Sequence, residues 1–145
     1  MTANLPKTDD RGAWTERVLA TNLAEIRPAE RDVLARLKEL AYDDDHLFAV
    51  RLALEEALVN AMKHGNQSDP SRSVRVRYRV SPECVEICVA DEGPGFNPGA
   101  VPDPTANENL DKPCGRGIML MRCYMDKVEF TPEGNEVLMV KNREP

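Results

Sequence analysis

A carboxylate and an amide, Glu56 and Asn60, stand four residues apart in a segment where apolar residues recur at helical spacing. A helix places residues four apart on one face, so both side chains can reach one ligand. Lys63 falls within about 60° of them on a helical wheel, and the apolar Leu52 and Val59 flank this face. Carboxylate and amide oxygens are ligands that Mg²⁺ accepts, with phosphates and waters completing its shell. The pattern indicates a helix face that borders a polar cleft, and two polar residues on the surface of a helix are the alternative.

A second group of residues with binding chemistry follows an apolar segment, residues 85–89, that is predicted to be a strand. Asp91 comes where this strand ends, and Gly93 and Gly95 follow it closely. A carboxylate here can accept a hydrogen bond from an exocyclic amine, and glycines allow the backbone to approach a flat ring. A tight surface turn would have the same composition, so this motif is weak when taken alone.

A third motif, Gly115-Arg116-Gly117, precedes a helix predicted over residues 118–125. Small residues at the start of a helix leave backbone N–H groups free to bind an anion, and the helix dipole favours negative charge there. Arg116, and Lys112 just before it, could offset the charge of a phosphate. Turn glycines explain many such pairs, and the motif is not a P-loop because no Gly-Lys-Ser/Thr follows. The order of the three motifs is more specific than any one of them.

The elements that position these motifs follow from the period of the apolar residues. The sequence predicts a strand over 14–21, helices over 29–40 and about 43–63, strands over 73–80 and 85–91, a helix over 118–125, and strands over 127–131 and 136–141. The acidic run Asp43-Asp44-Asp45 offers an N-cap and favourable first-turn charge to the second helix, and Gly65 is expected to end it. Arg75, Arg77 and Arg79 alternate with apolar residues and are expected on a solvated sheet face.

This order of elements predicts the fold class. It is an α/β (α+β) two-layer sandwich, in which about three helices cover one face of a mixed, mostly antiparallel sheet. The chain of 145 residues has the size of one domain. We expect residues 1–12 to be a disordered N-terminal arm and residues 13–145 to be the folded domain. Residues 96–114 are rich in Gly, Pro and Asn, and we expect them to form a lid over the site.

Charge and composition exclude several classes of function. The net charge of -6 and the pI of about 5.0 argue against a protein built to bind nucleic acid. No apolar run approaches the roughly 20 residues that span a bilayer, and the first residues do not form a signal peptide, so we expect a cytoplasmic protein without a membrane segment. Cys84, Cys88, Cys114 and Cys123 lack the spacing of a zinc site and are expected to be reduced thiols.

The three motifs together resemble those of a known superfamily. Residues 55–65 (EEALVNAMKHG) resemble its N box, residues 91–95 (DEGPG) its G1 box, and residues 115–118 (GRGI) its G2 box. This is the histidine-kinase-like ATPase superfamily, with the Bergerat ATP-binding fold that gyrase B, Hsp90 and MutL share. The resemblance covers most of residues 14–141.

Within that superfamily, the form of the N box and the ending GRGIMLMRCYMDKV (residues 115–128) resemble the anti-sigma-factor serine kinases. The resemblance implies that Glu56 is the general base for a protein serine and that Asn60 holds Mg²⁺. Glu55 is a rival for the role of Glu56, although the helical wheel turns it about 100° away. The remaining ATP-binding residues implied are Lys63, Asp91, Gly93, Gly95, Lys112, Gly115, Arg116 and Gly117.

The function implied is that of an ATP- and Mg²⁺-dependent serine/threonine kinase acting as an anti-sigma factor. Its substrate would be an anti-sigma-factor antagonist, a STAS-domain protein, and its second partner a sigma factor; a homodimer stays open. Two alternatives also stay open: a non-catalytic, nucleotide-gated binding module, and the catalytic half of a split histidine kinase. Glu56 argues against the first. His46 and His64 do not supply the phosphoacceptor helix pair that the second requires.

Overall fold

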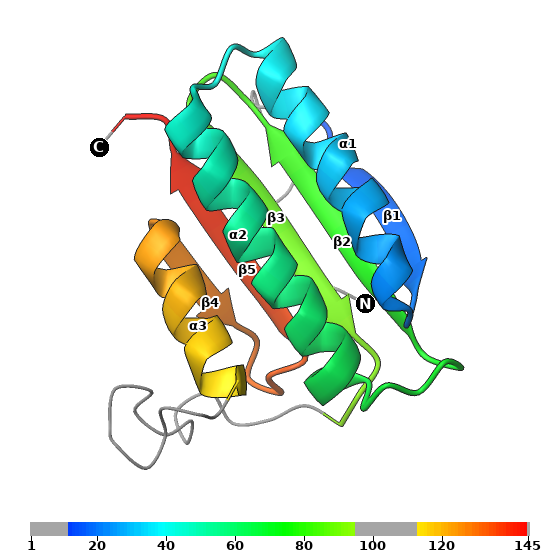
Figure 1. Cartoon of the computed structure of the whole chain (residues 1–145). Helices are drawn as coiled ribbons and strands as arrows, with labels where there is room; N and C mark the ends of the chain where they lie inside the picture. The colour runs from blue at the N-terminus through cyan, green and yellow to red at the C-terminus, as the bar shows by residue number, and fades with distance from the viewer. Residues whose placement is uncertain (1–11, 95–112, 145) are drawn as a thin grey trace.

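The computed structural model describes residues 12–94 and 113–144, with only the backbone for 113–118 (Figure 1). Its elements are β1 (Thr15–Ala20), α1 (Ile26–Glu39), α2 (Asp44–Asn60), β2 (Ser73–Val80), β3 (Cys84–Asp91), α3 (Pro113–Tyr124), β4 (Lys127–Phe130) and β5 (Glu136–Asn142). A short 3-10 turn, Leu23–Glu25, leads into α1, and a π-helical turn, Ala61–Gly65, continues α2.

The strands form one five-stranded sheet in the order β1-β2-β3-β5-β4, and the helices lie on one of its faces (Figure 1). The predicted two-layer sandwich is therefore confirmed. The sequence left room for a mixed sheet, but every strand pairing in the described residues is antiparallel. Both hairpins arise as expected, since the turns between β2 and β3 and between β4 and β5 are too short for a crossover.

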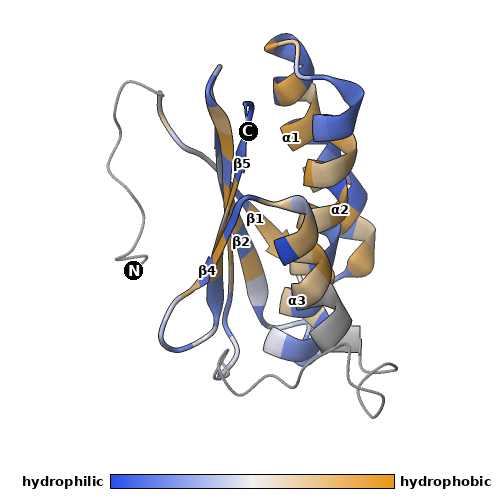
Figure 2. Ribbon diagram, turned by 90° about the vertical axis from the view of Figure 1, so that its left-hand side faces the viewer, coloured by the Kyte–Doolittle hydropathy of each residue, from blue (hydrophilic) through white to orange (hydrophobic). Residues whose placement is uncertain are grey.

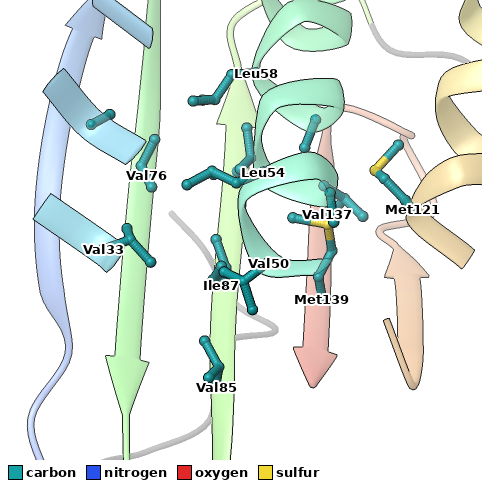
Figure 3. Close-up of a cluster of buried hydrophobic side chains, with 14 of the residues drawn as sticks. Val33, Val50, Leu54, Leu58, Val76, Val85, Ile87, Met121, Val137 and Met139 are labelled. Carbon is teal, nitrogen blue, oxygen red and sulfur yellow. The ribbon is translucent and has the colours of Figure 1, made fainter. Parts of the chain in front are cut away.

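The core fills the space between the sheet and the central helix α2 (Figure 3). Val50, Leu54 and Leu58 point from α2 toward β3, and all three are fully buried. Alternate residues of β3, including Ile87, meet them from the sheet. Burying one such side chain contributes about 1.5–3 kcal/mol. Hydrophobic residues, orange in Figure 2, are accordingly concentrated where the helices and the sheet face each other.

The two ends of α2 behave differently from each other. At its start, the Asp43 side chain accepts a hydrogen bond from the His46 amide at 2.9 Å, so the predicted N-cap is confirmed. At its end, α2 does not stop in a glycine cap, because Gly65 has no left-handed φ and the helix widens into the π turn. Single π turns within helices often occur at functional sites.

The face of the sheet opposite the helices corrects the prediction for Arg79. Arg75 and Arg77 are partly exposed as expected, whereas Arg79 is only 2% exposed. Its guanidinium pairs with Glu86 at 2.9 Å and lies 4.6 Å from the Trp14 ring, and it donates to the Gly12 carbonyl at 3.4 Å. The residues before β1 cover this part of the face, so the buried arginine needs a carboxylate partner. Gly12 is therefore part of the fold, while the rest of the predicted arm, residues 1–11, lies outside the described residues.

Other features of the described residues bear on the chemistry. Cys84, Cys88 and Cys123 are free thiols, and burial raises the pKa of Cys88 to about 12. None of the described helices is long and apolar enough to cross a membrane. No cluster of three or more His, Cys, Asp or Glu side chains suited to a metal occurs in the part of the chain that the structure describes.

Candidate functional site

Asn60 and Asp91, which come from motifs 31 residues apart in sequence, line one cavity. It lies beneath the end of α2, between β3, α3 and the β4–β5 turn. The other lining residues are Ala57, Ala61, Val89, Met121, Phe130, Gly134, Asn135, Glu136 and Val137. The cavity is narrow, with a volume of about 10 Å³. That is room for roughly one water molecule, so a larger ligand requires side chains of the lining to move.

Asp91 is held at the mouth of this cavity by backbone contacts on both sides. Its amide donates to the Asn135 carbonyl at 2.9 Å, and its Oδ1 accepts a hydrogen bond from the Gly93 amide at 2.8 Å. Burial raises the pKa of Asp91, and the Gly93 hydrogen bond lowers it in part. A partly desolvated carboxylate is a strong acceptor for a donor that excludes water from it, such as an aromatic amine.

Gly65 and Gly93 are glycines because the chain passes too close to itself at both positions. A Cβ at Gly65 would collide with the Asp91 carboxylate, and a Cβ at Gly93 would collide with the Gly65 carbonyl oxygen. The helical segment does end at Gly65, as predicted, but the predicted reason, a glycine cap, is wrong. Its small size lets the π turn pack directly against Asp91.

Glu56 and Glu55 occupy different environments, which favours Glu56 as the candidate base. Glu55 shares a side-chain hydrogen bond with Glu30 of α1, and burial together with Glu55 raises the pKa of Glu30 to about 7. Glu56 lies one turn before Asn60, and its pKa is not raised by a hydrogen bond to another carboxyl group. Burial, and then the charge of Glu55, raise the pKa of Glu56, which makes its carboxylate a better proton acceptor.

The remaining predicted site residues are placed less closely or not at all. Lys63 is exposed on the π turn and does not line the cavity. Gly95, Lys112 and residues 96–112 of the predicted lid lie outside the described residues, and the last two residues of that lid belong to α3. Gly115, Arg116 and Gly117 fall inside the first two turns of α3, because this helix begins at Pro113 and not at residue 118 as predicted. Proline suits the first position of a helix, where its missing N–H would be unpaired anyway.

Asn66 is a positioning residue that the sequence reasoning missed. Its side chain is fully buried and makes three hydrogen bonds. The Nδ2 group donates to Thr21 Oγ1 at 2.9 Å and to the Ser73 carbonyl at 3.0 Å, and Oδ1 accepts from the Glu92 amide at 2.8 Å. These bonds connect the ends of β1 and the π turn to the loop after Asp91. In sequence, an asparagine after a glycine reads as an ordinary turn residue, so no local signal marks this role.

A helix-backed sheet with this cavity at one end defines a class of nucleotide-binding domain. The chain belongs to the family of histidine kinase-like ATPase domains, which matches residues 19–141. This confirms the superfamily to which the three motifs pointed.

Relatives found among known proteins carry names from one functional group. The chain is 32% identical over 115 residues to the serine-protein kinase RsbW of Bacillus licheniformis, covering 73% of this chain and 72% of the relative. It is 29% identical over 132 residues to the anti-sigma F factor of Oceanobacillus iheyensis, covering 83% of this chain and 90% of the relative. These sequence similarities confirm the predicted resemblance to the anti-sigma-factor kinases.

A solved structure supports the fold independently. The crystal structure of the RsbU and RsbW domains of Rv1364c from Mycobacterium tuberculosis matches 90% of this chain with a TM-score of 0.61 and 14% identity. This chain spans about a third of the length of that protein, 32%. At such low identity the likeness concerns the fold alone.

Proposed function

We propose that this chain is an ATP- and Mg²⁺-dependent protein serine/threonine kinase that acts as an anti-sigma factor. Its substrate is a small anti-sigma-factor antagonist of the STAS type, and the outcome is regulation of transcription through a sigma factor. One observation carries the proposal: Asn60 and Asp91 line the same cavity, with Glu56 one helical turn away. The names of the relatives, serine-protein kinase RsbW and anti-sigma F factor, support the same function.

The residues of the cavity fit the parts that phosphoryl transfer needs. Asp91 accepts a hydrogen bond from the adenine amine, and the Asn60 amide oxygen is a ligand for Mg²⁺. Magnesium commonly keeps few protein ligands beside phosphates and waters, so one amide suits it. When bound, the metal neutralises negative charge on the phosphates. Residues 96–112 of the predicted lid and the first turn of α3 complete the phosphate site in this proposal. Its residues are Lys63, Lys112, Gly115, Arg116 and Gly117.

Glu56 acts on the protein substrate in this mechanism. Its carboxylate accepts the proton of a serine or threonine hydroxyl while the hydroxyl oxygen bonds to the γ-phosphorus of ATP. The bond from that phosphorus to the β–γ bridging oxygen breaks, and ADP leaves. The raised pKa of Glu56 improves proton transfer to it at neutral pH.

The cellular setting forms part of the same proposal. The kinase works in the cytoplasm, where its antagonist and sigma factor are found, and residues 13–145 act as one ATP-binding domain. The absence of a membrane-spanning helix from the described residues is compatible with this setting.

Incubation with labelled ATP, Mg²⁺ and STAS-domain proteins from the same genome tests the proposal. We expect acid-stable, hydroxylamine-resistant phosphate on a serine or threonine of one partner. Glu56→Gln should keep ATP binding and lower transfer by ~10²–10⁴. Acid-labile phosphate would instead indicate the split histidine kinase. ATP binding without transfer to any partner would indicate the non-catalytic module.

A further inference from the structure

An exposed aromatic side chain stands on the same ridge of α2 as the proposed catalytic residues. Phe48, Leu52, Glu56 and Asn60 follow one another at intervals of four residues along this helix. Side chains at that interval form a continuous ridge on a helix surface. Phe48 is 51% exposed, which is unusual for a large apolar side chain in this chain, and Leu52 is partly exposed. The apolar half of the ridge therefore runs directly into its polar half.

The neighbouring helix extends this apolar surface. Tyr124, at the end of α3, meets Phe48 edge to face, with ring centroids 5.8 Å apart and an interplanar angle of 74°. The two helices lie side by side (Figure 1). Phe48, Leu52 and Tyr124 thus form one surface that bridges α2 and α3, called here the Phe48 patch.

The Phe48 patch is close enough to Glu56 for both to lie within one protein interface. Phe48 precedes Glu56 by eight residues, or about 12 Å along the helix axis. A typical interface covers roughly 800 Å² on each partner, which corresponds to a disc of about 16 Å radius. A footprint of this size centred on Glu56 includes Phe48.

We infer that the Phe48 patch is the docking surface for the protein substrate, an inference that rests on the proposed kinase function. Buried aromatic side chains contribute a large share of binding energy in interfaces. The substrate then presents an apolar side chain to Phe48 and Tyr124 and its phosphoacceptor hydroxyl to Glu56. Docking through the patch orients the hydroxyl, while the cavity binds ATP separately.

The test compares two exposed apolar residues on opposite sides of the molecule. Val18 is 60% exposed, and its neighbour Leu19 is buried toward the helices, so Val18 lies on the other face of the sheet. Phe48→Ser, Val18→Ser and Phe48→Leu are assayed with a STAS-domain protein that the wild-type chain phosphorylates. We expect Phe48→Ser to raise KM for that protein at least tenfold while KM for ATP stays unchanged. Val18→Ser should match the wild type, and Phe48→Leu should retain most of the affinity.

Calorimetric binding of the same STAS-domain protein gives a second readout that does not depend on transfer. Equal KM and equal binding in Phe48→Ser and the wild type would overturn the docking surface while leaving the kinase proposal standing. So would a change in oligomeric state in Phe48→Ser with substrate affinity intact, since the patch would then join two copies of this chain. If the wild type neither binds nor phosphorylates any STAS-domain protein, the proposed function fails and the docking surface fails with it.

Discussion

The side-chain oxygen of Asn66 accepts a hydrogen bond from the backbone amide of Glu92 at 2.8 Å. Glu92 directly follows Asp91, so this bond fixes the backbone that presents the Asp91 carboxylate to the cavity. The two donors of the same amide are used on Thr21 and Ser73, and water cannot replace any of these contacts because Asn66 is fully buried. One buried side chain thereby aligns three segments that are distant in sequence.

Asn66→Ala should weaken ATP binding by more than its effect on stability explains. The substitution removes the acceptor for the Glu92 amide together with both donors, and leaving a buried group unpaired costs about 1–3 kcal/mol. We expect a lower melting temperature and also a reduced preference for ATP over GTP, because the Asp91 backbone shifts. Measuring both nucleotides separates these effects. Asn142→Ala, on an exposed asparagine at the far end of β5, serves as the control. An unchanged ATP to GTP ratio would limit Asn66 to a structural role.

Asp91→Asn and Asn60→Ala should weaken nucleotide binding in different ways. The asparagine of the Asp91→Asn variant would have one neutral acceptor oxygen, which the Gly93 amide uses, and an NH2 group in place of the second carboxylate oxygen. The adenine amine then loses a charged acceptor worth about 1.5–3 kcal/mol, or roughly 10–100-fold in affinity. This loss should persist when Mg²⁺ is chelated. Loss of the Asn60 amide should matter only when Mg²⁺ is present. Titration calorimetry with and without EDTA distinguishes the two, and wild-type affinity in both variants would place the nucleotide elsewhere.

Gly65→Ala should damage the site although alanine is a better helix former than glycine. The added Cβ would meet the Asp91 carboxylate, and the π turn must shift to make room. Overpacking of this kind costs about 1–3 kcal/mol. We expect lower ATP affinity and a lower melting temperature, whereas His64→Ala, at the exposed neighbouring position, should change neither. If Gly65→Ala were as stable as the wild type, the close contact would be easily relieved.

Glu30→Gln should stabilise the fold as the pH rises. The pKa of Glu30 is raised from 4.5 to about 7, so the folded state holds a proton that the unfolded state releases. Stability therefore falls with increasing pH between these two values. Glutamine carries no charge to bury, so the variant should gain up to about 3 kcal/mol over the wild type above pH 7 and little below pH 4. Urea denaturation across this range measures the difference, with the exposed Glu39→Gln as control. A gain that does not vary with pH would contradict the assignment.

The sequence was sufficient for features that depend on local spacing. The helical position of Asn60 and the position of Asp91 at a strand end predicted that these two side chains border one site, because helix and strand geometry convert spacing into direction. Glu56 lies one helical turn before Asn60 and does not line the cavity. The same reasoning predicted the two hairpins and an N-cap within the acidic run 43–45.

It was insufficient where the decisive partner is remote in the chain. The burial of Arg79 depends on Gly12, 67 residues away, and on Trp14, so an alternating pattern within β2 could not reveal it. Gly65 looked like a helix cap because its contact with Asp91 exists only after the sheet and α2 have packed. Asn66 is recognised by the geometry of its three partners and by nothing in its immediate sequence.

The narrowness of the cavity has a kinetic consequence. Val89, Met121 and Phe130 leave room for about one water molecule in the cavity that Asp91 shares with Asn60, so adenine bound there as proposed requires these side chains to move. This movement then precedes or accompanies binding. The observed affinity for a nucleotide equals its affinity for the open form multiplied by the fraction of molecules that are open. The observed association rate should consequently reach a plateau at high nucleotide concentration. The plateau is set by the rate at which Val89, Met121 and Phe130 move apart, and not by diffusion.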